Sequence, residues 1–207
     1  MSLPRRLVQL YLGLVLYGFS ASLLVLAGLG LDPWDVFHQG LAKHTPLAIG
    51  TWAIVVGGVV LLLWIPLRQR PGFGTLSNVV MVGGTMDVVL GVLSPPHALA
   101  ARILLLVAGV FLNGVATGLY IGAGLGPGPR DGLMTGLAAR GHSIRVVRTA
   151  LELTVLATGW LLGGTVGVGT VLYAVSIGPL AHVFIPLLSR APAPRAPEAA
   201  LASQPLE

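Results

Sequence analysis

The sequence predicts an all-α polytopic membrane protein with six transmembrane helices, arranged as two inverted three-helix repeats with a short extra helix after the first span of each repeat. Apolar residues make up 55% of the 207 residues and charged residues only 9%, whereas about a quarter of the residues in a soluble domain are charged. The apolar residues gather in six long runs, and one stretch of sequence occurs twice. Most of the chain is therefore expected to contact lipid.

Six segments have the length of about 20 residues that is needed to cross the hydrocarbon core. They are Leu7 to Gly28, Ala48 to Leu67, Gly74 to Leu93, Leu99 to Ala123, Ser143 to Gly163 and Val166 to Leu188. We interpret the first as a full span and not a signal peptide, because no small-residue cleavage site with a soluble domain follows it. The expected units are a first repeat over residues 1–95, a second over residues 96–188, and a disordered cytoplasmic tail over residues 189–207, which is rich in Pro and Ala.

The Lys and Arg residues lie in the short gaps between these runs and predict the orientation. Cytoplasmic loops carry an excess of Lys and Arg. With both termini inside, ten of the twelve basic residues are cytoplasmic, Arg130 among them, and only Lys43 and Arg102 are outside. The net charge of +5 is thus a topology signal and does not indicate a nucleic-acid partner. We expect a multi-pass protein of the bacterial cytoplasmic membrane, N-in and C-in.

A near-copy of the segment Ala27 to Ala42 lies 96 residues later, at Ala123 to Ala138, with nine identities in sixteen positions. With a shift of 95 residues, the segment "GFGT" at Gly72 to Thr75 also matches "GVGT" at Gly167 to Thr170. The chain therefore reads as two copies of a three-span unit. An odd number of spans turns the second copy upside down, an arrangement found in many secondary transporters, although a fold does not establish a function.

The repeated segment predicts a short helix in each copy. Asp32 is suited to the N-cap, Pro33 to the first helical position, and Asp35 to bonding back to free backbone donors. In the second copy, Pro129 opens the helix and Asp131 supplies the returning carboxylate. The helix is either interfacial, with Trp34 among the headgroups, or a half-helix whose N-terminal end faces a cavity between the repeats. In both cases the aspartates are expected to cap helix ends and not to perform acid/base chemistry.

Ionisable residues inside the spans are candidates for a solute or ion pathway, because a charge at mid-bilayer destabilises the protein unless it is paired. Asp87 shares a helix face with Gly83 and Gly91 and is expected to face the bundle. Its counterpart in the second repeat is His182. Such a pair is suited to relaying protons or holding a polar solute; the alternative is that each is buried, neutral and hydrogen-bonded to its surroundings.

Three further polar residues complete the candidate set. Glu152 lies near mid-depth, where Arg148 one turn earlier can neutralise it. Asn78 and Asn113 add amide groups. Asn113 adjoins a ridge formed by Gly114, Gly118 and Gly122, which is typical of close helix packing.

Several of these motifs resemble those of the bacterial YczE and YitT type membrane proteins. They are "GLGLDPWDV" after the first span, the following "IG", the loop "GFGTLSN" and "GG..D" in the third span. The resemblance runs from Leu7 to Leu188 and implies a membrane location. The second copy departs from the motif, with Arg130 where the first has Trp34. The family has no settled activity, so the resemblance implies no substrate.

The chain lacks the signatures of an enzyme: it has no phosphate-binding loop, no His-Glu-x-x-His and no Gly-x-Ser-x-Gly, and its histidines have no metal-ligand spacing. No cysteine is present. We therefore expect no catalytic site, metal or cofactor.

The leading hypothesis is a small-solute transporter with a polar cavity between the repeats. The alternatives are a non-transporting accessory or regulatory membrane protein and the substrate-binding subunit of an ATPase-driven importer. Expected partners are the bilayer, a small molecule or ion, and a second copy or another membrane protein.

Overall fold

A computed structural model describes residues 2–189, which form eight α-helices and no strands. The order of long and short helices is the same in both halves of the chain. The helices are α1 (Leu3–Ala27), α2 (Pro33–Lys43), α3 (Ile49–Leu67), α4 (Phe73–Val92), α5 (Leu99–Gly122), α6 (Pro129–Ala138), α7 (Ile144–Leu161) and α8 (Val168–Leu188). The six long helices coincide with the six predicted segments to within a few residues. The predicted tail lies outside the described residues from residue 190 onward.

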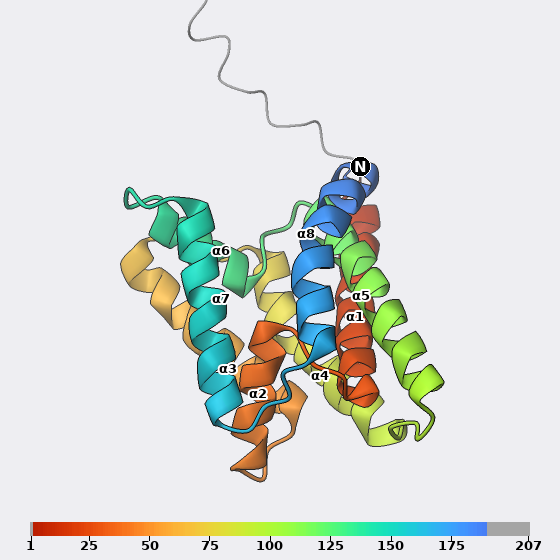
Figure 1. Ribbon diagram of the computed structural model, residues 1–207. Coiled ribbons are helices and arrows are strands. Elements are labelled where there is room, and N and C mark those ends of the chain that lie inside the picture. Colours follow the sequence, from red (N-terminus) through yellow and green to blue (C-terminus); the bar gives the residue numbers. More distant parts are fainter. Residues whose placement is uncertain (1, 190–207) are drawn as a thin grey trace, which may run out of the picture.

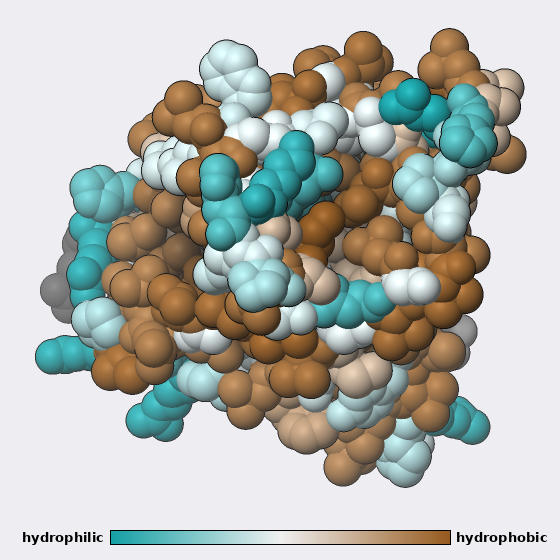
Figure 2. All heavy atoms as spheres, turned by 90° about the horizontal axis from the view of Figure 1, so that it is seen from below, coloured by the Kyte–Doolittle hydropathy of each residue, from teal (hydrophilic) through white to brown (hydrophobic). Residues whose placement is uncertain are grey.

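Five of the long helices, α1, α3, α4, α5 and α8, are long and apolar enough to cross a membrane. The sixth, α7, differs because it carries Arg145, Arg148 and Glu152 within 18 residues. Large apolar side chains lie exposed along the outer faces of α3, α4, α5 and α8. Figure 2 shows the same character on the surface seen from below, where hydrophilic side chains gather in a few patches on a largely apolar surface. This distribution suits a protein whose solvent is lipid.

The long helices form two groups with the short helices between them (Figure 1), and the groups are joined where α3 packs on α4. In the first group α1 packs along α5, α4 packs on α1, and α8 packs on α5. In the second group α3 and α7 pack against the two short helices, with α2 on α7 and α6 on α3. From mid-height, α2 runs downward and α6 runs upward in the view of Figure 1. The starts of the two short helices therefore meet inside the molecule.

The glycine ridge of α5 is a packing surface, as predicted. A side chain on Gly114 would collide with Leu180, one on Gly118 with the backbone of Phe184, and one on Gly122 with the Leu188 carbonyl oxygen at 2.7 Å. All three contacts are with α8. Small residues let two helix backbones approach closely in a membrane, so these glycines set the distance between α5 and α8.

Two turns of the same shape follow α1 and α5. Gly28 and Gly30 have φ values of 59° and 117°, and their counterparts Gly124 and Gly126 have φ values of 64° and 128°. Only glycine adopts such values without strain. Each turn contacts the start of a helix in the other half: a Cβ atom on Gly30 would meet Thr170, and one on Gly126 would meet Thr75.

An arginine from the opposite half closes each turn. The Arg6 guanidinium donates to the carbonyl oxygens of Ala123 and Gly124, and the Arg102 guanidinium donates to those of Ala27 and Gly28. Arg102 lies 96 residues after Arg6, the same shift that relates the two turns. The contacts between the halves are therefore reciprocal at these positions.

Candidate functional site

The two short helices begin in different ways. Asp32 is the N-cap of α2, and its Oδ1 accepts hydrogen bonds from the backbone N–H groups of Trp34 and Asp35 at 3.0 and 3.3 Å. At the start of α6, Gly128 has no side chain that could cap the helix, and no side-chain bond is made there. A helix N-terminus carries a partial positive charge of about half a unit. The site therefore contains one capped and one uncapped positive helix end.

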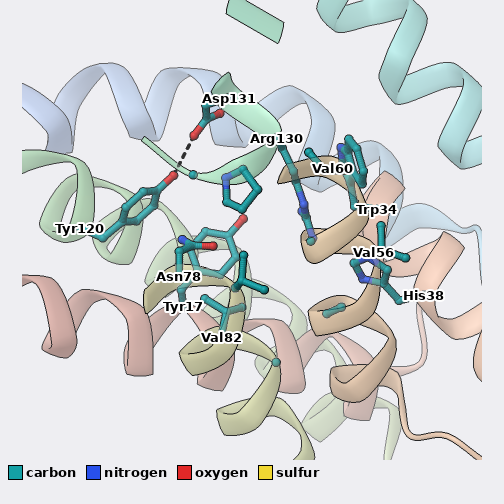
Figure 3. A pocket seen from close by; sticks show the side chains of 16 residues that line it. Tyr17, Trp34, His38, Val56, Val60, Asn78, Val82, Tyr120, Arg130 and Asp131 are labelled. Atoms are coloured by element: carbon teal, nitrogen blue, oxygen red, sulfur yellow. Dashed lines mark hydrogen bonds between the residues drawn. The ribbon is translucent and has the colours of Figure 1, made fainter. Parts of the chain in front are cut away.

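Arg130 bridges the two helix starts. Its guanidinium lies 3.5 Å from Asp32 Oδ1, 3.8 Å from Asp35 Oδ1 and 5.0 Å from the ring centre of Trp34. Figure 3 shows Arg130 beside Trp34 in the pocket. The assignment of Arg130 to a cytoplasmic loop is therefore wrong: this arginine is a partner of carboxylates and an aromatic ring in the interior. Arg130 therefore no longer counts among the ten basic residues that were assigned to the cytoplasmic side and that predict the orientation.

His38 and Asp35 form a buried pair on α2. His38 Nδ1 lies 3.0 Å from Asp35 Oδ1, and the two side chains are 1% and 3% exposed. The expectation that Asp35 bonds back to the start of its own helix is wrong, because its carboxylate faces His38 and Arg130 instead. Two buried side-chain nitrogens among the described residues have no hydrogen-bond partner, His38 Nε2 and Trp34 Nε1.

Asp131 also differs from the expected cap. Its Oδ2 accepts a hydrogen bond of 2.9 Å from the Tyr120 hydroxyl, marked in Figure 3, and not from the backbone at the start of α6. Tyr120 is 5% exposed and comes from α5. The carboxylate is thus held by a long helix of its own half of the chain. The α6 start keeps its free N–H groups.

The structure decides against an interfacial position of Trp34. Its side chain is buried, with 6% exposed. A headgroup anchor must reach the surface of the protein, so that interpretation is wrong. The N-terminal ends of the two short helices lie close together inside the protein, where Arg130 of α6 contacts Asp32 of α2.

Two pockets lie on opposite sides of Arg130 and share Tyr17, Trp34, Tyr120, Arg130 and Asp131 as lining residues. The first, of about 80 Å³, extends toward α3 and α4, and the second, of about 210 Å³, toward α7 and α8. Five positions of the first recur in the second 95 residues later: Ala53, Gly57, Asn78, Val82 and Gly83 correspond to Arg148, Glu152, Tyr173, Ile177 and Gly178. Residues of both halves line each pocket, and part of each lining comes from equivalent positions of the two halves.

Of the five polar residues predicted to line a solute pathway, two line these pockets and three lie elsewhere. Asn78 lines the first pocket and Glu152 the second. Glu152 accepts a hydrogen bond of 2.9 Å from Arg148, so the expected pairing is confirmed. Asn113 lies behind the second pocket, where its amide donates to the Ser20 hydroxyl and accepts from the Tyr173 hydroxyl.

Asp87 and His182 are not brought together at this site. Asp87 faces α3, where its carboxylate accepts from the Gly50 N–H at 2.7 Å and from the Thr51 hydroxyl at 2.6 Å. His182 is exposed on α8. Neither residue lines either of the two pockets beside Arg130.

Sequence reasoning missed Arg130, His38 and the three tyrosines Tyr17, Tyr120 and Tyr173. A signal existed for each of them. Arg130 replaces Trp34 at the repeated motif, next to a helix start that has lost its capping carboxylate. His38 follows Asp35 by three residues, which places both on one helix face. The tyrosines carry hydroxyl groups in the middle of apolar runs, where a partner is required.

The cluster combines a guanidinium, three carboxylates, an imidazole and an indole N–H around two helix starts. Such a set can bind a polar solute and exchange ion-pair partners. No group of three His, Asp or Glu residues suited to a metal ion occurs among residues 2–189.

Comparison with known proteins identifies the family. The chain matches, over residues 4–186, a family of unknown function, DUF6198, and belongs to it. It is 43% identical over 184 residues to an uncharacterized protein of Haemophilus influenzae, covering 88% of this chain and 84% of that one. It is 35% identical over 179 residues to the uncharacterized membrane protein YczE of Bacillus subtilis, covering 85% and 83%. No solved structure matches the chain. The resemblance to YczE-type proteins is confirmed, and the chain is a multi-pass membrane protein.

Proposed function

We propose that this member of DUF6198 is a small-solute transporter, in which two inverted three-span repeats alternately expose a polar site centred on Arg130. The observation that carries the proposal is the pair of pockets that meet at Arg130, each lined in part by equivalent positions of the two halves. Alternating access through inverted repeats uses such a site at the repeat interface, with half-helix ends facing it. The protein would have six spans, with α7 as the fifth.

Reciprocal contacts support the inverted arrangement. The Gly74 N–H donates to the Leu125 carbonyl at 2.8 Å, and the Gly169 N–H donates to the Leu29 carbonyl at 2.8 Å. The paired bonds of Arg6 and Arg102 follow the same rule. Contacts that exchange when the halves are exchanged are those of a twofold relation. Arg148 lines the second pocket and is not counted either, so eight basic residues are left on the cytoplasmic side against two outside, and the orientation is N-in and C-in.

Charge on α7 also fits a transporter. Arg148 and Glu152 line the second pocket at the depth of a span. Charged groups in a membrane face a water-filled cavity or a partner and not lipid. The second pocket would then be hydrated, and α7 would cross the bilayer with its charged face toward that pocket.

Flux through the purified full chain in liposomes tests the proposal. Labelled amino acids, carboxylates, amines, urea and monovalent cations form the panel, with Arg130→Gln as the variant and Arg140→Gln as the matched control, because Arg140 is an arginine that lines neither pocket. We expect saturable flux of one solute class, a loss of at least about tenfold in Arg130→Gln, and no change in Arg140→Gln, since one interaction of about 1.4 kcal/mol changes a rate tenfold.

Two results would contradict transport. One is the absence of flux across the whole panel from folded wild-type protein. The other is flux that is equal in wild type and Arg130→Gln. A null panel together with a fixed membrane partner in pull-downs would favour the accessory protein.

A further inference from the structure

We propose that the first pocket binds a small polar solute without net charge, which accepts a hydrogen bond from Trp34 Nε1 and donates one to His38 Nε2. This inference rests on the proposed function and names the class of solute. Trp34 and His38 both line this pocket, and their free nitrogens are the two buried side-chain polar atoms without a partner among residues 2–189. Buried polar groups are nearly always paired in native proteins, so two unpaired atoms at one pocket indicate a ligand.

The protonation of His38 determines what the ligand must offer. Its Nδ1 faces the Asp35 carboxylate at 3.0 Å, and a carboxylate oxygen only accepts. The side chain of His38 is only 1% exposed, and burial disfavours the charged ring. The Nδ1 atom therefore carries the one proton of the neutral ring, which leaves Nε2 with a lone pair. The indole N–H of Trp34 is a donor only. A solute that satisfies both atoms has a donor and an acceptor of its own.

Charge around the pocket excludes simple ions of either sign. A lone cation beside Trp34 would meet the Arg130 guanidinium, whose centre is 5.0 Å from the indole ring. A lone anion at Arg130 would meet the carboxylates of Asp32 and Asp35, which lie within 4 Å of the guanidinium. Like charges at such distances repel strongly in an interior of low dielectric constant. A zwitterion or a neutral amide avoids both penalties.

The walls of the pocket limit the size of the solute. Val56, Val60, Val79 and Val82 also line the pocket, and its volume is about 80 Å³. That volume is several times the roughly 10 to 15 Å³ that a cavity needs to hold one water molecule. The class is therefore that of glycine, alanine, urea or acetamide, and not that of a nucleotide or a sugar.

Ligand-dependent thermal stability and calorimetry of the full chain in detergent test this site without measuring transport. The probes are glycine, alanine, urea and acetamide, with acetate and methylammonium as singly charged controls. We expect at least one uncharged probe to raise Tm saturably, and neither control to do so. Trp34→Phe keeps an aromatic ring beside Arg130 but removes the N–H, so the affinity for that probe should fall at least about tenfold while the Tm without ligand stays equal or rises.

Control variants distinguish a loss of binding at this pocket from a loss of folding. Trp160→Phe changes an exposed tryptophan of α7 and should bind the probe as wild type does. If Trp34→Phe does not fold, Ala53→Leu carries the test, because it fills the same pocket from α3 and should also abolish binding. The inference is overturned if no uncharged probe stabilises wild type, or if the folded pocket variant binds as wild type does.

The experiments distinguish an error in the proposed binding site from an error in the proposed transport function. Binding without flux leaves the site in place and removes the transport function. Flux that persists unchanged in Trp34→Phe and Ala53→Leu leaves transport in place and removes this site.

Discussion

The helix pair α3 and α4 is closed, whereas the equivalent pair α7 and α8 is open. Along α3 and α4, Gly50 and Gly83 meet so closely that a side chain on either would overlap the backbone of the other. The counterpart of Gly83 is Gly178 on α8, and a side chain there would meet nothing within 4 Å. The adjoining pockets measure about 80 and 210 Å³, with the larger at the open pair. Equivalent positions thus form a tight contact in one half and line a cavity in the other.

The residues of α7 explain the difference. Arg145 and Glu152 stand where α3 has Gly50 and Gly57. Glycine permits close approach of helix backbones, whereas a long charged side chain needs space and water. The charged residues of α7 therefore favour separation from α8, and the glycines of α3 favour contact with α4.

The largest effect should come from filling the two equivalent glycine positions. Gly83→Leu forces a side chain into the backbone of Gly50 and against Ile54, so we expect it to lower the free energy of unfolding by about 2 to 3 kcal/mol or to prevent folding. Gly178→Leu projects into open space and should change stability by less than about 0.5 kcal/mol. Thermal unfolding in detergent, followed by circular dichroism, measures both variants.

Equal destabilisation by the two leucines would contradict the comparison. It would mean that α8 packs on α7 in solution as α4 packs on α3. Gly84→Leu is a suitable control on α4, because a side chain at Gly84 meets nothing within 4 Å and lies next to the contact.

A moderate effect is expected at Asp87. This carboxylate joins α4 to the start of α3 through the Gly50 N–H and the Thr51 hydroxyl. Asp87→Ala removes both bonds and should cost about 2 kcal/mol, because hydrogen bonds to charged groups contribute about 1.5 to 3 kcal/mol. Its counterpart His182 is exposed on α8, so His182→Ala should cost less than about 0.5 kcal/mol. A comparable loss in both variants, measured by chemical or thermal unfolding, would show that His182 also joins two helices.

Much of the fold could be predicted because its signals are local. Runs of apolar residues locate the long helices, and Pro33 and Pro129 mark the starts of the short ones to the residue. The cluster around Arg130 could not be found in this way. Arg130 and Asp32 are 98 residues apart, and an arginine near a turn looks like a topology signal until its partners are known.

Asp87 illustrates the opposite error. Its position inside an apolar run indicates function, because an unpaired charge at that depth is unfavourable. In the structure this carboxylate accepts hydrogen bonds from an N–H and a hydroxyl at the start of the neighbouring helix α3. No local sequence pattern predicts these partners. A buried charge seen in sequence alone thus cannot be assigned to structure or to function until its partners are located.

The smallest effect should come from Glu152, which pairs with Arg148 on α7. The side chains of Arg148 and Glu152 are 53% and 33% exposed, and exposed ion pairs contribute about 0.2 to 1 kcal/mol. We therefore expect Glu152→Gln to lower stability by less than about 0.5 kcal/mol, less than Asp87→Ala, with the difference from wild type vanishing at high salt. A loss as large as that of Asp87→Ala, insensitive to salt, would mean that Glu152 is shielded from water. Since α8 is the helix across the second pocket from Glu152, α7 and α8 would then close around that charge. The open and closed pairs would in that case be two states of one mechanism and not a fixed difference between the halves.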